Sequence, residues 1–213
     1  LMALKEYIKT KNPKNIGLNY SENFPLVDGI SKSDYELFYN SMSPEIKKKI
    51  VSAENLGIQW IETRIELEKK IYKDLVSITQ NIINEAFSNK VIKPGVTTTD
   101  DVVWWMREKV LELKLKTWFH PTVDVQRNKK SDLYAFDGKS KYDIIQPGDL
   151  VHCDFGISYL TLNTDCQQIA YVLKPNEKQA PLFLKNALKD ANKLQNILTG
   201  EFRLDKTGNE ILS

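Results

Sequence analysis

Two aspartates eleven residues apart, Asp154 and Asp165, are the residues of this chain whose type and spacing could do chemistry. Each lies in a stretch typical of a β-strand, and the residues between them predict a hairpin. If its loop is centred near residues 159 and 160, the two aspartates lie opposite each other and share one face of the sheet. Two carboxylates so close repel each other, and one protonates unless a cation lies between them. A pair of divalent metal ions would relieve that repulsion most simply.

The alternative interpretation of these aspartates is a pair of edge or turn residues. Carboxylates inside otherwise apolar strands are costly unless they have partners. The apolar neighbours Leu150, Val151 and Phe155 therefore favour a ligand role for Asp154 and Asp165 over the alternative. Asp149 differs, because it follows Pro-Gly and is expected to be a turn residue.

The composition is that of a globular protein. The chain has 213 residues, of which 41% are hydrophobic and 27% are charged, and its formal net charge is +2. Such a balance gives no support for nucleic-acid or anionic-membrane binding, so we expect neither partner. There is no apolar run of about 18 residues, and hence no predicted membrane span. The first residues resemble the interior of a helix, so the missing signal peptide does not decide the compartment, with the cytoplasm favoured.

The order of elements predicts an α+β domain with a curved antiparallel sheet covered by helices. Residues 1–60 contain short mixed elements, including a helix capped by Ser33, and we expect them to be the end of a larger domain. From residue 61 a long amphipathic helix is predicted to reach residue 86. A capping box within residues 97–101 begins a second helix, and strands and further helices follow it.

The cysteines, Cys153 and Cys166, predict no disulfide framework. The hairpin geometry places them opposite each other on the face that the aspartates do not occupy. A cross-strand disulfide is one possibility, and two small buried thiols are the preferred one.

Residues 147–156, Pro-Gly-Asp-Leu-Val-His-Cys-Asp-Phe-Gly, resemble the first ligand strand of the "pita-bread" metallopeptidases, the M24 family. This family includes methionine aminopeptidases, aminopeptidase P, prolidase and creatinase. Residues 164–173, which begin Thr-Asp, resemble its second ligand strand, and further resemblance lies at 92–102 and 207–211. Residues 1–60 look like the end of a creatinase-type N-terminal domain, and residues 61–213 like the first part of the catalytic domain.

The resemblance implies a pita-bread fold, truncated in this chain, with a dinuclear metal centre. Asp165 is similar to the aspartate that bridges to the first metal, and Asp154 to the one that binds the other ion through both oxygens. The two ions, Mn²⁺, Co²⁺, Fe²⁺ or Zn²⁺, would generate a hydroxide that attacks an N-terminal peptide bond. The implied partner is a peptide of the Xaa-Pro aminopeptidase or prolidase type, and the resemblance allows a homodimer.

The chain departs from the family pattern in two ways. The family completes its site with a histidine in a His-x-x-Gly-His segment and two glutamates, all well after the second aspartate, and no such segment follows Asp165 here. A longer protein or a second chain would have to supply these ligands, so we expect the 213 residues alone to be inactive. The family's substrate-contacting histidine is also missing from its usual zone, here residues 132–137.

Two residues are candidates for substrate contacts. His120 could replace the missing histidine as a substrate-contacting or proton-transfer group, or it could be a hydrogen-bonded pocket-wall residue. Arg127 could bind a substrate carboxylate, or it could be a surface arginine. His152 shares the face of Asp154, and a structural role is favoured for it.

Two other functions remain open. One is a non-catalytic peptide- or protein-binding module on the same fold, which the missing histidine favours and the intact aspartates oppose. The other is a C–N hydrolase of the creatinase kind that acts on a small amidine. That reaction needs no metal, so the two aspartates also count against it.

Overall fold

A computed structural model describes residues 2–127 and 143–213. The chain divides into two compact units, Leu1–Glu66 and Leu67–Ser213. The predicted boundary followed residue 60, whereas the observed one follows Glu66. None of the helices in the described part is long and apolar enough to cross a membrane.

The first unit packs short helices against a two-stranded parallel sheet. Its elements are α1 (Met2–Lys11), β1 (Ile16–Leu18), a 3-10 turn (Pro25–Val27), α2 (Lys32–Ser41), α3 (Pro44–Lys47), β2 (Ile50–Ser52) and α4 (Glu54–Glu62). Ile8, Phe38 and Met42 form its small core. The predicted cap Ser33 is wrong, and Ser31 caps α2 instead. The hydroxyl of Ser31 accepts a hydrogen bond from the amide of Asp34, three residues later, as an N-cap side chain does.

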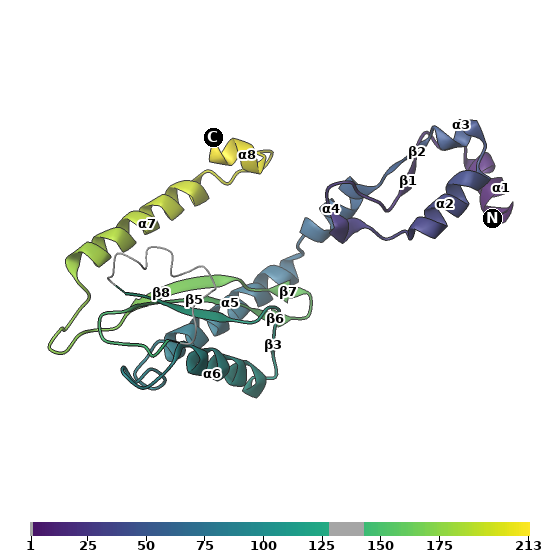
Figure 1. The fold of residues 1–213 in the computed structure, drawn as a ribbon. Helices are drawn as coiled ribbons and strands as arrows, with labels where there is room; N and C mark the ends of the chain where they lie inside the picture. Colours follow the sequence, from purple (N-terminus) through teal and green to yellow (C-terminus); the bar gives the residue numbers. More distant parts are fainter. Residues whose placement is uncertain (1, 128–142) are drawn as a thin grey trace. The chain divides into compact units, whose positions relative to one another are not determined.

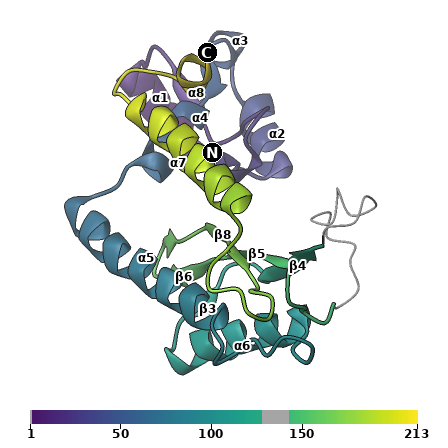
Figure 2. The same ribbon diagram turned by 90° about the vertical axis from the view of Figure 1, so that its left-hand side faces the viewer.

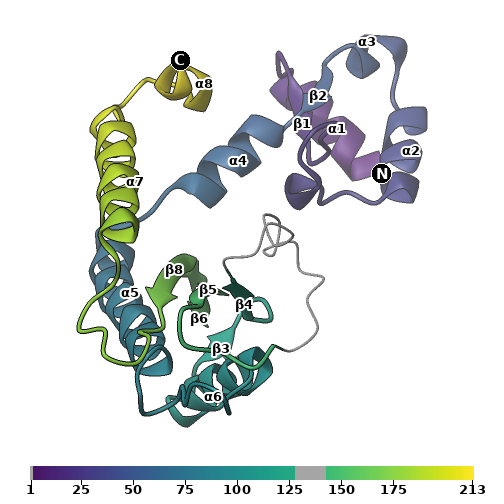
Figure 3. The same cartoon turned by 60° about the vertical axis from the view of Figure 1, so that its left-hand side comes forward.

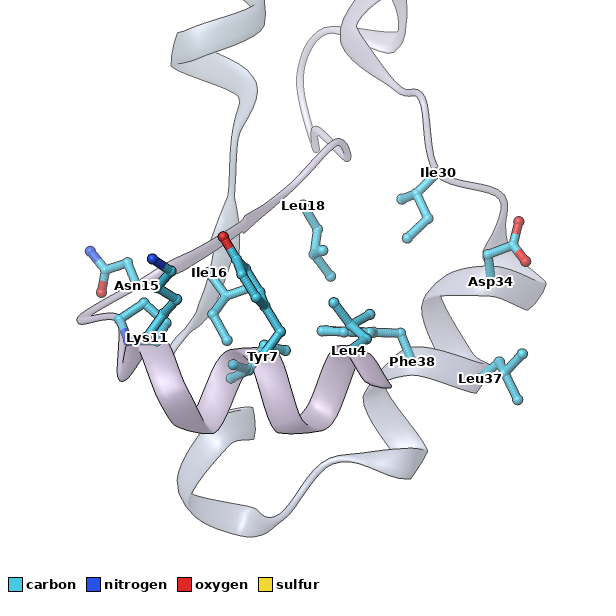
Figure 4. A pocket seen from close by; sticks show the side chains of 12 residues that line it. Leu4, Tyr7, Lys11, Asn15, Ile16, Leu18, Ile30, Asp34, Leu37 and Phe38 are labelled. Atoms are coloured by element: carbon cyan, nitrogen blue, oxygen red, sulfur yellow. The ribbon is translucent and has the colours of Figure 1, made fainter. Parts of the chain in front are cut away.

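An apolar pocket of about 670 Å³ opens between α1, β1 and α2 of this unit (Figure 4). Leu4, Tyr7, Leu18 and other aliphatic side chains line it, with Lys11 and Asp34 as its charged residues. This lining holds one carboxylate, Asp34, and neither histidine nor cysteine.

The predicted helix over 61–86 is two helices. α4 ends at Glu62, and α5 runs from Glu66 to Ala86. Thr63 ends α4 because its backbone turns extended while its amide and hydroxyl both donate to the carbonyl of Gln59. Ile61 and Ile65, which the periodic pattern placed on the buried stripe, are exposed.

The second unit is built on α5, α6 (Thr99–Glu112) and six short strands (Figure 1). The predicted capping box is confirmed: Thr98 accepts the amide of Asp101, and the Asp101 carboxylate accepts the amide of Thr98. The strands are β3 (Lys116–Thr117), β4 (Thr122–Gln126), β5 (Leu150–Phe155), β6 (Ile157–Tyr159), β7 (Leu162–Asn163) and β8 (Cys166–Tyr171). In the described residues they form two antiparallel three-stranded sheets, ordered β4-β5-β8 and β3-β6-β7. Figure 3 shows the strands of the first of these sheets.

Alternation along β5 divides its sheet into two chemically different faces. Val151, Cys153 and Phe155 are buried against the apolar stripes of α5 and α6, which cover the same side of the sheet (Figure 2). His152 and Asp154 point to the other side and are only half-buried. The helices therefore hold the sheet by one face and leave the carboxylate face accessible.

Two helices follow the sheet, α7 (Leu182–Gly200) and α8 (Gly208–Leu212). No residue of α7 is buried in the described structure, although it carries Phe183, Leu188 and Leu194.

The packing of the core predicts that substitutions at two positions of α6 differ sharply in their effect on stability. Met106 is completely buried between the helices and the sheet, whereas Leu111 is 75% exposed. Met106→Ala should lower the free energy of unfolding by about 2–5 kcal/mol, because it removes buried methylenes and leaves a cavity. Leu111→Ala, the control, should change it by less than about 0.5 kcal/mol. Urea denaturation followed by circular dichroism measures both, and equal losses would contradict the assigned face.

Candidate metal centre

The hairpin that carries the two aspartates has a different register from the one predicted. Asp154 pairs with Gln167, and Ser158 pairs with Asn163, so the chain turns at Leu160 and Thr161. The prediction that Asp154 lies directly opposite Asp165 is therefore wrong. Leu160 takes a left-handed conformation (φ 54°) that an aliphatic residue rarely adopts, so a turn at this position could not be predicted from its residue type.

The two aspartates nevertheless lie on one face of the sheet. The real turn lies one residue later than predicted, which moves the cross-strand partner of Asp154 by two residues, from Asp165 to Gln167. Side chains alternate with a period of two, so a shift of two leaves Asp165 on the same face as Gln167 and Asp154. The two carboxylates are diagonal neighbours instead of direct partners.

Asp154 is in an environment that disfavours its charged form. Burial raises the pKa of its carboxyl group, and the neighbouring carboxylate of Asp165 raises that pKa further. Its Oδ2 accepts a hydrogen bond from Gln167 Nε2 at 3.2 Å. Its Oδ1 is buried and has no hydrogen-bond partner within the part of the chain that the structure describes.

Gln167 connects Asp154 to His152 across this face. Since its amide nitrogen donates to Asp154, its Oε1 is the atom that lies 3.1 Å from His152 Nε2. A carbonyl oxygen can only accept, so the proton of this hydrogen bond belongs to His152 Nε2. His152 is thus linked to Asp154 through Gln167, and the structural role favoured for it stays a prediction.

Asp165 lies just outside the β-ladder, and its neighbour Thr164 fixes its position. β7 ends at Asn163 and β8 begins at Cys166. Thr164 is fully buried, its amide donates to the carbonyl of Ile157 at 2.9 Å, and its own carbonyl accepts the indole N–H of Trp118 at 2.6 Å. The sequence analysis identified Thr164 only as part of a Thr-Asp motif and did not identify its contact with Trp118.

Gly156 makes this arrangement possible. A Cβ added at Gly156 would lie 2.0 Å from the carbonyl oxygen of Thr164 and 2.4 Å from Trp118 Nε1. Both distances are far below van der Waals contact, so a side chain at this position would separate the two partners of that hydrogen bond.

Asp154 and Asp165 have the character of a partial metal site. Two carboxylates supply the oxygen donors that hard divalent ions prefer. The buried Oδ1 of Asp154 and the raised pKa of its carboxyl group are both features that a bound cation would relieve. No group of three or more histidine, cysteine, aspartate or glutamate side chains with metal-binding geometry occurs in residues 2–127 and 143–213. The described residues therefore fit as two ligands of a larger set.

Arg127 is bound within the chain. Its Nε and Nη2 donate to the two carboxylate oxygens of Asp149 at 2.9 and 3.1 Å, and Nη2 also donates to the carbonyl of Ile144. The Asp149 carboxylate is the main cause of the raised pKa of the guanidinium. Substrate binding by Arg127 stays a prediction. A substrate carboxylate would have to share the guanidinium with Asp149 and the carbonyl of Ile144.

Asp149 is a turn residue, as predicted, but its burial was missed. Its amide donates to the carbonyl of Gln146, and its carboxylate accepts the amide of Gln146 as well as the Arg127 contacts. Its side chain is only 3% exposed. An aspartate after Pro-Gly is usually at the surface, and a partner 22 residues earlier in the sequence leaves no local signal.

His120 lies before β4, in contact with α6. Arg107 Nη1 donates to its Nδ1 at 2.8 Å, and Trp104 presents its ring edge to the imidazole at 6.2 Å between centroids. Thr122, two residues later, pairs with Asp154. A substrate-contacting role for His120 stays a prediction, and the zone of the missing family histidine, 132–137, lies outside the described residues.

The cysteines are free thiols on the helix-covered face. Cys153 pairs with Gln168 and Cys166 with Phe155, so they are not opposite each other as predicted. Burial raises the pKa of the Cys153 thiol to about 12. Cys166 is half-buried, and burial raises its pKa too, so neither thiol is an activated nucleophile.

The ion pair between Arg127 and Asp149 should contribute measurably to stability. Asp149→Asn removes the charge that Arg127 faces, and we expect a loss of about 2–3 kcal/mol, below the usual range for a buried pair because Arg127 is partly exposed. Asp143→Asn is the matched control, since Asp143 is 41% exposed and lies 3.5 Å from the same guanidinium. Its loss should stay under about 1 kcal/mol. Equal losses in urea denaturation would contradict the role of Asp149.

The raised pKa of the Asp154 carboxyl group predicts that Asp154→Asn stabilises the folded chain, and that the size of this stabilisation depends on pH. The folded chain holds the Asp154 proton more tightly than the unfolded chain does, so stability falls as the pH rises through the folded-state pKa. Asparagine cannot ionise, and the variant should be more stable than the original chain at neutral pH and equal to it near pH ~3. Thermal denaturation in EDTA across this range measures the difference. Asp190→Asn, on exposed α7, is the control, and a gain independent of pH would contradict the explanation.

Comparisons with known proteins agree with this geometry. The chain resembles the solved structures of an X-Pro aminopeptidase from Thermotoga maritima MSB8 (TM-score 0.62, 14% identity, 92% of this chain and 50% of that one) and of a putative aminopeptidase P from Bacillus anthracis (0.62, 16%, 88% and 44%). An Xaa-Pro dipeptidase from Bacillus anthracis also matches, with a TM-score of 0.52, 17% identity and coverage of 97% and 51%.

These likenesses show a shared fold, the predicted pita-bread fold. The chain spans about half the length of the solved structures that it matches. No curated protein sequence matches it. The family model for metallopeptidase family M24 matches residues 70–212, which include both aspartates and the whole sheet. The chain is therefore a member of metallopeptidase family M24.

Proposed function

We propose that this chain is part of a dinuclear metallopeptidase of the Xaa-Pro aminopeptidase or prolidase type, which removes residues from the N-terminus of a peptide. The observation that carries the proposal is the pair Asp154 and Asp165 on one uncovered sheet face, within a chain of the M24 family. The titles of the solved structures with this fold, X-Pro aminopeptidase and Xaa-Pro dipeptidase, support the Xaa-Pro substrate class.

Each residue of the site would have a defined task. Asp154 and Asp165 would hold two divalent ions, which, when bound, would activate water near neutral pH and polarise the scissile carbonyl. Gln167 would keep Asp154 Oδ2 in place through its 3.2 Å hydrogen bond and leave Oδ1 for an ion. His152 would fix the orientation of the Gln167 amide. The choice among Mn²⁺, Co²⁺, Fe²⁺ and Zn²⁺ is left to the ligands beyond these two.

The 213 residues alone should not catalyse peptide hydrolysis. Two carboxylates leave most coordination positions of two ions to water, which weakens binding and fails to fix the ions. We propose that a histidine and two glutamates from further sequence complete the site. In the same framework, the unit Leu1–Glu66 is the end of a creatinase-type N-terminal domain.

A metal titration tests the site in the chain as it stands. Mn²⁺ should broaden the NMR signals of the amides around Asp154 and Asp165, and Asp154→Asn or Asp165→Asn should weaken this broadening by about tenfold or more, because each removes one of two charged ligands. Asp190→Asn on α7 is the control and should leave the broadening unchanged. Broadening that is absent, or insensitive to both variants, would remove the basis for a metallopeptidase.

A panel of Xaa-Pro dipeptides and tripeptides, assayed with and without Mn²⁺, then tests the substrate class on a polypeptide that contains the remaining ligands. Metal-dependent release of the N-terminal residue is the expected result. Metal-dependent hydrolysis by the 213-residue chain alone would contradict its predicted inactivity. A longer protein that binds metal yet cleaves none of these peptides would favour the non-catalytic binding module, and metal-independent hydrolysis of an amidine would favour the creatinase-type reaction.

A further inference from the structure

Two buried threonine hydroxyls join α5 to the segment just before Asp165. Thr79 in the middle of α5 and Thr164 after β7 are both fully buried. Their Oγ1 atoms are 2.8 Å apart, although the residues are 85 positions apart in the sequence. The rest of the buried face of α5 is largely aliphatic, with Leu75, Ile82 and Ile83 as its main members.

The hydrogen bonds around these hydroxyls form one directed chain. Thr79 Oγ1 donates to the carbonyl of Leu75 at 2.9 Å, and the amide of Ile157 donates to Thr164 Oγ1 at 3.0 Å. Each hydroxyl has one proton, so Thr164 Oγ1 donates to Thr79 Oγ1 in this arrangement. The alternative acceptor for Thr164, the carbonyl of Ile157, is farther away at 3.4 Å. Every donor and acceptor is then satisfied from the Ile157 amide to the Leu75 carbonyl.

A buried hydroxyl in an apolar helix face needs a reason. Burying a hydroxyl costs free energy that its hydrogen bonds only offset, and a valine of the same shape would pack in the same space. The specific result of the hydroxyl at position 79 is a fixed contact with Thr164. Thr164 and Asp165 lie between the ends of β7 and β8, where the strand pairing continues through one backbone hydrogen bond, from the Thr164 amide to the Ile157 carbonyl at 2.9 Å. Their position depends on the contacts of Thr164 with Thr79, Ile157 and Trp118.

We propose that Thr79 is a positioning residue of the metal centre, which acts through Thr164 to hold the Asp165 carboxylate beside Asp154. The inference rests on the proposed function for its purpose, since the ions are what the two carboxylates would share. The geometry on which it depends, the link from α5 to Thr164, is independent of that function. Partners that orient metal ligands typically change metal affinity by about 10- to 100-fold when they are removed.

The test compares Thr79→Val, which removes the hydroxyl, with Thr79→Ser, which keeps it. Mn²⁺ affinity is measured on the full chain by the broadening of the Asp165 amide signal. We expect Thr79→Val to bind Mn²⁺ about tenfold more weakly or worse, and Thr79→Ser to stay near the original value. Trp118→Phe removes the indole donor from a half-exposed side chain and should weaken binding in the same direction, which keeps the test available if Thr79→Val does not fold.

Thr97→Val is the matched control. Thr97 is also buried in this unit, and its hydroxyl accepts the amide of Lys93 at 2.9 Å and donates to the carbonyl of Val91 at 3.2 Å, so neither partner is Thr164 or Asp165. The Thr97→Val variant should be less stable than the original chain and should bind Mn²⁺ with the same affinity. Weak binding by Thr97→Val or by Thr79→Ser would overturn the inference, because general stability or the methyl group would then explain the effect. Unchanged binding in Thr79→Val would overturn it as well.

Hydrogen exchange separates this inference from the proposed function. If the original chain binds Mn²⁺ no better than Asp165→Asn does, the metallopeptidase proposal fails, and the role of Thr79 is decided by exchange of the Thr164 and Asp165 amides. Thr79→Val should accelerate that exchange by about tenfold or more relative to Thr97→Val, because it frees the segment locally. Equal exchange rates in the two variants would overturn the positioning role.

Discussion

Two like charges on one half-buried sheet face are the constraint on which the rest of the second unit depends. Asp154 is disfavoured as an anion by burial and by Asp165, and one of its oxygens has no hydrogen-bond partner among the described residues. A sheet that carries this unfavourable pair must gain its stability elsewhere. The opposite face supplies it, where Val151, Cys153 and Phe155 pack against the apolar stripes of α5 and α6. The sheet is thus stabilised on the face opposite the two aspartates.

The polar contacts near the aspartates have a different purpose from the core. Gln167 holds one oxygen of Asp154, and the hydroxyls of Thr79 and Thr164 connect the segment before Asp165 to a helix. Each contact adds little net free energy, because a hydrogen bond in the folded chain replaces one to water. These contacts fix the orientation of the side chains, which the proposed metal centre would need at a precision that apolar packing alone does not give. The ion pair of Arg127 and Asp149 does the same for the turn that enters β5.

The sequence predicted the family and fold of this region better than the register of its hairpin. The face shared by Asp154 and Asp165 followed from the period of two, and it survived a wrong register because the error was an even number of residues. The turn at Leu160 and Thr161 could not be predicted, since neither residue is typical of a tight turn. The break before α5 was hidden by apolar residues at helical spacing, Ile61 and Ile65, which are exposed. Thr79 and Asp149 were missed because their partners are distant in the sequence, and local patterns contain no information about such pairs.

Gly156 shows that a missing side chain at one position can determine where residues of other segments lie. The site where its Cβ would be is occupied by the carbonyl oxygen of Thr164 and the indole nitrogen of Trp118. Its contribution to the fold is therefore a volume kept empty, which lets two segments from different parts of the chain meet. A single added methyl group, which carries no charge, would be enough to displace Thr164 and with it the neighbouring Asp165.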